Sequence, residues 1–168
     1  FLLFYFNQIL QVSGTLTGIA LGIALFCDAI TDPLAGSISD RLETRWGRRH
    51  PMMMGAALPL GISIIALFNP PTGMSEMFYF GWLITFAVSA RLFLTLYHIP
   101  HLALGAEMAQ DYLDRTRVYS FSQFFGTVGS AGFGFLMLTL FFPTTEEFSH
   151  GLLNTNGYGP FSTAAAIG

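Results

Sequence analysis

The chain has 168 residues, of which 52% are hydrophobic and only 10% are charged. Soluble domains carry roughly 25% charged residues, so this composition excludes an ordinary soluble domain and indicates a membrane protein. The net charge of −3, with the arginines confined to a few places, argues against a nucleic-acid partner. The single cysteine, Cys27, excludes an intramolecular disulfide framework.

Apolar runs, taken in chain order, predict an all-α protein that crosses a lipid bilayer several times. Residues 1–11 are too short to span it, and we expect them to be the end of a preceding helix. Four later runs approach or exceed the ~20 residues that a span requires, and they cover about residues 15–38, 52–68, 77–104 and 118–142. An outer loop at 143–160 is expected to lead to the start of a further helix at 161–168.

The arginines predict which connections face the cytoplasm. Six of the seven lie in the connections at 39–51 and 105–117, and the other two connections have none. Arginine-rich loops usually stay on the cytoplasmic side, so we expect a multi-pass protein of the plasma or inner membrane with both arginine loops cytoplasmic. The alternation also agrees with an uninterrupted series of crossings.

Two carboxylates lie inside the second apolar segment. Asp28 and Asp32 are four residues apart and therefore share one face of a helix. A charge in the bilayer centre costs roughly 2.5–3.5 kcal/mol, and two ionised carboxylates about 6 Å apart repel by on the order of 3 kcal/mol at an effective dielectric near 20. A bound Na⁺ or a proton would relieve this repulsion, which predicts a cation-coupling site. The alternative is a structural pair neutralised by Arg91 or by hydroxyl groups of another helix.

A cationic stripe is predicted on the fourth segment. Arg91, Thr95 and His98 recur at four and three residues and share a helix face. Facing the acidic stripe, Arg91 and His98 would contact substrate in a cavity, unless Arg91 only pairs with an aspartate. His101 lies near the end of the segment and could reach the cytoplasmic surface instead. Two histidines three residues apart without a third ligand are a weak metal signal, so no metal or cofactor is expected apart from Na⁺ as a possible coupling ion at the aspartates.

Two further features complete the candidate site. In the loop after the second segment, acidic residues, a glycine and arginines follow one another within a few positions. This pattern suggests a salt bridge that acts as a latch at the cytoplasmic gate. The latch residues are Asp40, Arg41, Arg48 and Arg49. The glycine-rich fifth segment is expected to serve helix packing. Gln123, near its start, is the polar residue of that segment that could reach a substrate cavity.

Several separate motifs resemble the major facilitator superfamily. The stretch GSISDR at 36–41 followed by GRR at 47–49 resembles the superfamily's signature between its second and third helices. The DAITDP motif at 28–33 is similar to the glycoside–pentoside–hexuronide cation symporters, the branch that contains melibiose carriers. ALGAE at 103–107 and DYLDRTR at 111–117 resemble that branch's fourth helix and the loop after it.

The resemblance implies a partial six-helix half of a twelve-helix major facilitator fold, running from the end of helix 1 to the start of helix 6. It also implies a cation held by Asp28 and Asp32, with Thr31 and Thr95 as supporting ligands. The chain departs from melibiose carriers at the sugar site, because His98 stands where they have an acidic residue and Gln123 where they have an arginine. The cation site therefore transfers better than the sugar site.

These observations predict a secondary active transporter and no enzyme. We expect Na⁺ or H⁺ symport of a sugar or glycoside-like solute by alternating access, with the bilayer and the remaining helices of a longer chain as partners. A carrier of lysolipids or other organic solutes with the same fold is the main alternative. An intramembrane Mg²⁺-dependent transferase would need a second acidic cluster at the same depth, which the spans lack. A non-transporting membrane scaffold is the remaining alternative.

Overall fold

The computed structural model describes residues 2–42, 45, 47, 49–108, 111–143, 152 and 157–167. These residues form helices and connections and contain no strand. The elements are α1 (Leu2–Phe4), the π-helical turn η1 (Tyr5–Ile9), α2 (Gly14–Arg41), α3 (His50–Phe68), α4 (Glu76–Met108), α5 (Tyr112–Phe141) and α6 (Tyr158–Ile167). Four of them, α2 to α5, are long and apolar enough to cross a membrane. The expected all-α, multi-pass architecture is thereby confirmed.

Local sequence explains several helix ends. The side chain of Ser13 caps α2 by accepting a hydrogen bond from the backbone N–H of Leu16 at 3.3 Å. Proline lies in the first turn of α3, where its missing N–H costs nothing. The turn between α3 and α4 contains Gly73 at φ +78°, a backbone conformation that glycine adopts without strain.

Several helix ends differ from the sequence expectation. The connection expected at 105–117 is mostly helical, because α4 continues to Met108 and α5 begins at Tyr112. The expected bounds mark only the apolar part of each helix. The backbone hydrogen bonds of a helix can continue beyond that part into polar sequence. Arg117 and Asp114 form an ion pair of 3.6 Å on the first turns of α5, which suits this exposed position. Helix α6 similarly begins at Tyr158, ahead of the expected residue 161.

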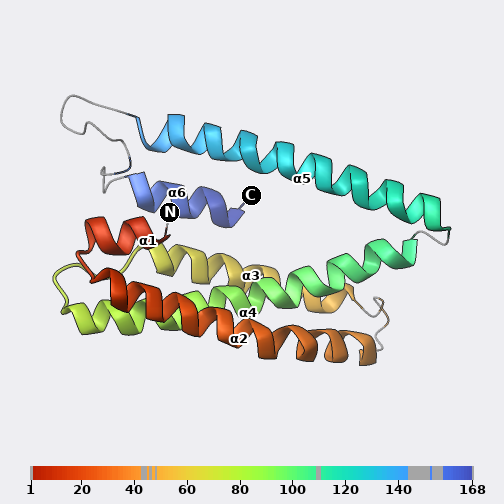
Figure 1. The fold of residues 1–168 in the computed structure, drawn as a ribbon, viewed down its shortest axis with the longest axis horizontal. Coiled ribbons are helices and arrows are strands. Elements are labelled where there is room, and N and C mark those ends of the chain that lie inside the picture. The colour runs from red at the N-terminus through yellow and green to blue at the C-terminus, as the bar shows by residue number, and fades with distance from the viewer. Residues whose placement is uncertain are drawn as a thin grey trace.

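The helices lie side by side in an order that differs from their order in the chain. In Figure 1, α2 and α3 flank α4, α6 lies on the far side of α3, and α5 runs outermost above α6. Successive long helices run in opposite directions, as successive membrane crossings require. Consequently α2 and α4, separated by one helix in the chain, run parallel to each other.

The parallel pair α2 and α4 keeps one register along its length. Four pairs of residues that are 63 positions apart face each other. Hydrogen bonds join Ser13 with Glu76, Asp28 with Arg91, and Asp32 with Thr95, and a methyl group added at Gly36 would lie 3.8 Å from Ile99. The last three are spaced by four residues on each helix, so they occupy one face over successive turns. We call these four pairs the α2–α4 seam. It places both aspartates and Arg91 on a shared internal face.

An aromatic cluster closes the end of the bundle at which α3 ends and α4 begins. Tyr5 and Tyr158 have ring centroids 4.5 Å apart, and the Tyr5 hydroxyl donates to the carbonyl of Phe68 at 3.0 Å. Phe142 packs edge-on against Tyr158 at 4.8 Å. This cluster ties the first segment to α3 and α6. The candidate site lies farther along α2 and α4, away from this packed end.

Candidate functional site

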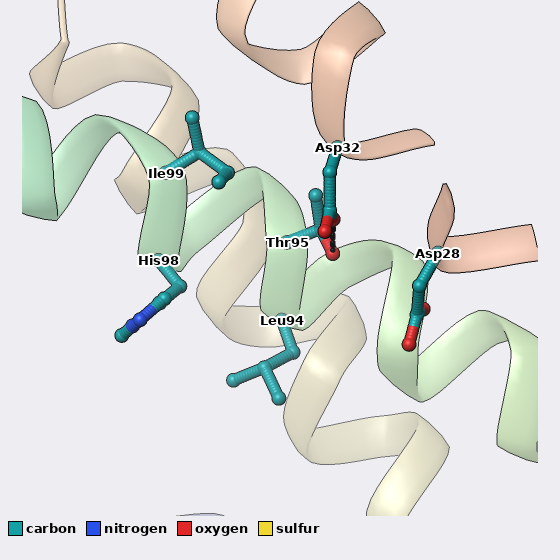
Figure 2. A pocket seen from close by; sticks show the side chains of 6 residues that line it. All are labelled: Asp28, Asp32, Leu94, Thr95, His98 and Ile99. Carbon is teal, nitrogen blue, oxygen red and sulfur yellow. Dashed lines mark hydrogen bonds between the residues drawn. The ribbon is translucent and has the colours of Figure 1, made fainter. Parts of the chain in front are cut away.

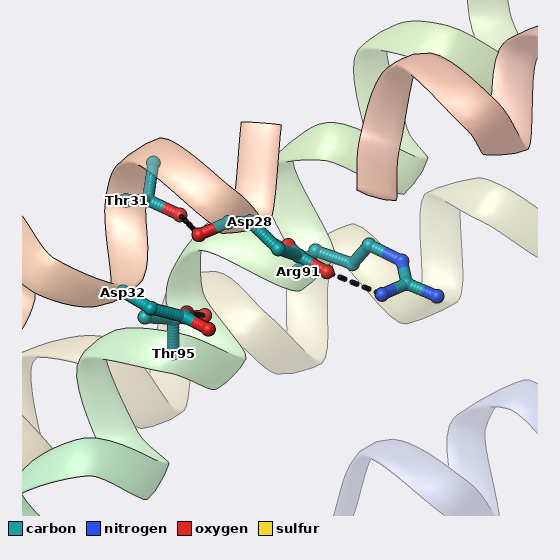
Figure 3. Close-up of polar contacts among 5 residues, drawn as sticks. All are labelled: Asp28, Thr31, Asp32, Arg91 and Thr95. Atoms are coloured by element: carbon teal, nitrogen blue, oxygen red, sulfur yellow. Dashed lines mark hydrogen bonds and ion pairs between the residues drawn. The ribbon is translucent and has the colours of Figure 1, made fainter. Parts of the chain in front are cut away.

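Asp28 is paired with a cation within the described part of the chain. A guanidinium nitrogen of Arg91 on α4 donates to Oδ2 of Asp28 on α2 (Figure 3). The Arg91 and Asp28 side chains are 39% and 20% exposed, respectively. An arginine–carboxylate contact in such a partly buried place is stronger than one on an open surface. The pairing that the sequence left open as an alternative is therefore the observed geometry.

Asp32 has a different partner, one turn further along both helices. The hydroxyl of Thr95 donates to Oδ1 of Asp32 at 2.8 Å, and the Thr95 side chain is buried. In the part of the chain that the structure describes, Asp32 makes no ion pair. Because a threonine hydroxyl is neutral, it satisfies one lone pair of the carboxylate without balancing its charge.

A cavity of about 350 Å³ opens beside the two carboxylates (Figure 2). It is lined by Asp28, Asp32, Leu94, Thr95, His98 and Ile99. Both carboxylates and the imidazole project from α2 and α4 at this cavity, while Leu94 and Ile99 add apolar walls. Few convergent polar groups in a mostly apolar cleft are typical of a small-molecule binding site.

The remaining predicted ligands are placed less centrally. The hydroxyl of Thr31 donates to the backbone carbonyl of Asp28 at 3.4 Å, and Thr31 is not among the cavity's lining residues. The Arg91 guanidinium is also absent from the lining and lies on the side of Asp28 away from Asp32 in Figure 3. Gln123 is exposed on α5, where it borders a separate cavity of about 640 Å³ with Thr127 and three neighbours.

His101 is separated from the main cavity. Its ring stacks on Tyr97 with centroids 6.0 Å apart, and it borders a cavity of about 200 Å³ between α4 and α5. The hydroxyl of Tyr119 on α5 closes one side of that region by donating to the carbonyl of Leu102 at 2.9 Å. Within the described residues, no three histidine, cysteine or acidic side chains come together as a metal site.

Two of the four predicted latch residues, Asp40 and Arg49, meet at the far end of α2. Arg49 forms an ion pair with Asp40 at 3.2 Å and donates to the hydroxyl of Ser39 at 3.3 Å. The Arg49 side chain is only 10% exposed, and Ser39 is fully buried. Arg41 is the last residue of α2 and is exposed, and Arg48 lies outside the described residues.

Ser39 is the partner that sequence reasoning missed. It precedes Asp40 directly and falls on the buried face of α2 with Ala35. A hydroxyl four residues beyond a buried alanine, next to the acid of a latch, is a signal that the helical period could have supplied. The burial of Arg49 is consistent with this hydroxyl and the Asp40 carboxylate together compensating its charge.

Four helices long and apolar enough to cross a membrane define the class as polytopic membrane proteins, and the cavity between α2 and α4, with its two carboxylates, is of a size that suits a small solute. The family described as MFS/sugar transport protein matches residues 1–166. The chain belongs to this family, which confirms its resemblance to the major facilitator superfamily and to that superfamily's glycoside–cation symporter branch. Its members are transporters, and the expectation that this chain is no enzyme is confirmed.

Individual relatives agree with this assignment. The chain is 33% identical to the "Uncharacterized symporter sll1374" of Synechocystis sp., over 77% of this chain and 25% of the relative. It is 30% identical to the "Inner membrane symporter YicJ" of Escherichia coli, over 83% of this chain and 30% of the relative. It is 23% identical to the "Isoprimeverose transporter" of Lactiplantibacillus pentosus, over 98% and 33%. The chain thus spans a third or less of these relatives' length. No solved structure matches it.

Proposed function

We propose that this chain forms the N-terminal part of a longer secondary active carrier that moves a cation, Na⁺ or H⁺, together with a sugar or glycoside-like solute. Transport would proceed by alternating access, in which the bound cation and solute bias the packing of the helices. The remaining helices of the carrier, the solute and the coupling cation are the expected partners.

The observation that carries the proposal is the charge of the cavity. Asp28 and Asp32 on α2, together with Arg91 beside the cavity on α4, leave one net negative charge when all three are ionised, within two helices that are long and apolar enough to cross a membrane. Charged groups in such positions are costly and are usually functional. One monovalent cation at the cavity would balance this charge, which gives cation binding a direct effect on the energy of the site.

The cavity also suits a hydroxylated ring. His98 can donate or accept hydrogen bonds, and Leu94 and Ile99 offer apolar contact to the C–H face of a sugar. The name of one relative, the isoprimeverose transporter, supports a solute of this chemistry. The same apolar walls can accept the chain of a lysolipid, so a lysolipid belongs in any test of substrate.

The proposed orientation keeps the arginine-containing ends of α2 and α5 in the cytoplasm, in agreement with the positive-inside rule. Arg49 and Asp40 would then hold the cytoplasmic ends of α2 and α3 together in one state of the cycle. Arg41 and Arg48 are assigned to the same gate by their place in the motif.

Uptake by the full-length carrier in proteoliposomes tests this function. Imposed Na⁺ and H⁺ gradients should drive accumulation of one member of a panel of glycosides, sugar acids and lysolipids. Asp32→Asn should abolish cation-driven accumulation, while exchange of solute without a gradient continues. Asp114→Asn, an exposed change at the start of α5, serves as the matched control and should retain accumulation. Accumulation by Asp32→Asn at the normal level would overturn the cation assignment.

A further inference from the structure

The two carboxylates of the cavity occupy unequal positions on the α2–α4 seam. Asp28 faces a guanidinium and Asp32 faces a hydroxyl, although the two contacts are related by the same one-turn step on both helices. Their sequence spacing alone treats the two aspartates as equivalent. The helix that they face makes them different.

Arg91 lies in a position from which it contacts only one of the two carboxylates. Its guanidinium contacts Asp28 and lies on the side of that residue away from Asp32. An arginine stays protonated in proteins and cannot leave the site, in contrast to a bound ion. The charge at Asp28 is therefore balanced by the protein itself.

No further described side chain on the packed helices changes this balance. On α3 the titratable group is His50, at the first residue of the helix, and α6 has no acidic or basic residue. The charged residues of α5 lie within its first two turns. Among the described residues at the level of the cavity, the acidic and basic side chains are thus Asp28, Asp32, Arg91 and His98.

We infer that Arg91 is a built-in counter-cation for Asp28, and that Asp32 alone binds the exchanging monovalent cation, one per transport cycle. This inference rests on the proposed function and sharpens it, because it assigns different roles to two residues that a carboxylate pair would share. Arg91 is then a positioning and charge-setting residue and makes no contact with the solute. Thr95 holds Asp32 in place for the cation.

The test combines charge removal on both sides of the Asp28–Arg91 pair in the full-length carrier. Asp28→Asn leaves Arg91 unbalanced beside the site and should lower cation-driven accumulation at least about tenfold. The double variant Asp28→Asn/Arg91→Gln removes both charges and should recover to within about threefold of the unmodified carrier. Asp32→Asn should abolish coupling in either background.

Cation stoichiometry supplies an independent measurement. The unmodified carrier should respond to the coupling cation with a Hill slope near one, whereas Arg91→Gln, which leaves both carboxylates unbalanced, should respond more steeply. Na⁺ and H⁺ are varied separately, so that the experiment identifies the ion. Thermal melting of each purified variant shows whether it is folded, and the charge-exchanged variant Asp28→Arg/Arg91→Asp replaces any single variant that does not fold. It should retain coupling, since Asp32 is unchanged.

Two results would overturn the inference. A double variant no more active than Asp28→Asn would mean that the Asp28 carboxylate itself binds the cation. A Hill slope near two in the unmodified carrier would mean that both aspartates do. Both results require cation-driven accumulation by the unmodified carrier; its absence with every solute and either gradient would instead reject the proposed function.

Discussion

The α2–α4 pair and helix α5 have similarly apolar sequences, but their side chains are packed to different extents. Five residues of α2 are buried, and its polar groups meet partners on α4 at regular intervals. On α5 the buried residue is Met137 alone, and a methyl group added at Gly126 or Gly129 would meet no atom within 4 Å among the described residues. Apolar composition therefore makes a span, whereas a few polar residues on α2 and α4 set the register of that pair and form the candidate site.

The largest expected effect comes from a threonine-to-valine substitution on α4, which is compared with the same substitution on α5. Thr95→Val removes the hydroxyl that donates to Asp32 and should weaken cation dependence by about 1.5–3 kcal/mol, roughly tenfold or more in the cation concentration for half-maximal uptake. Thr127→Val removes a hydroxyl that only donates to its own helix at Gln123. It should leave that concentration unchanged. Equal effects of the two variants would contradict the contrast between the helices.

A second comparison uses two arginine ion pairs, Arg49–Asp40 at the end of α2 and Arg117–Asp114 on α5. Arg49→Met should lower the free energy of unfolding by about 1–3 kcal/mol, because Arg49 is nearly buried and bonds both Ser39 and Asp40. Arg117→Met, at an ion pair whose arginine is 73% exposed on α5, should change it by less than about 0.5 kcal/mol. Thermal or denaturant melting of the purified carrier measures both. A larger loss for Arg117→Met would show that α5 is held as firmly as α2.

A smaller effect than that of Arg49→Met is expected at the exposed end of the α2–α4 seam. Oε1 of Glu76 accepts a hydrogen bond from the backbone N–H of Ser13 at 2.9 Å, at the positive end of the α2 dipole. Glu76→Gln keeps an acceptor and loses the charge, so the carrier should lose about 0.3–1 kcal/mol of stability. Added salt should lower the stability of the unmodified protein toward that of the variant. A loss that salt does not alter would exclude the dipole as its cause.

Much of the architecture could be predicted from the sequence, for a clear physical reason. Spans follow from apolar runs, and the shared face of Asp28 and Asp32 follows from the helical period. The partner of each aspartate could not be predicted, because it depends on the relative shift of two helices that are separated by a third. For this reason the sequence alone does not show whether Arg91 pairs with Asp28 or with Asp32.

Two residues predicted to belong to the site lie away from the cavity in this structure, and they stay predictions for the full-length carrier. Thr31 was assigned as a supporting ligand by resemblance, yet its hydroxyl satisfies the backbone of its own helix. Gln123 was assigned to the substrate site by position, and in the described chain it borders a different cavity on α5. Both depend on side-chain direction and helix placement, which residue spacing does not specify. Whether Gln123 contacts solute stays a prediction for the full-length carrier.

The constant offset along the α2–α4 seam also limits how these two spans can move. A slide of α4 by one helical turn, about 5.4 Å, would bring Arg91 opposite Asp32 and Thr95 opposite Gly36, leaving Asp28 without its cation. A slide of half a turn would separate every polar contact of the seam at once. Both shifts break the present Asp28–Arg91 and Asp32–Thr95 contacts. We therefore expect α2 and α4 to move together as one rigid unit, and any rocking to occur between this pair and the neighbouring helices.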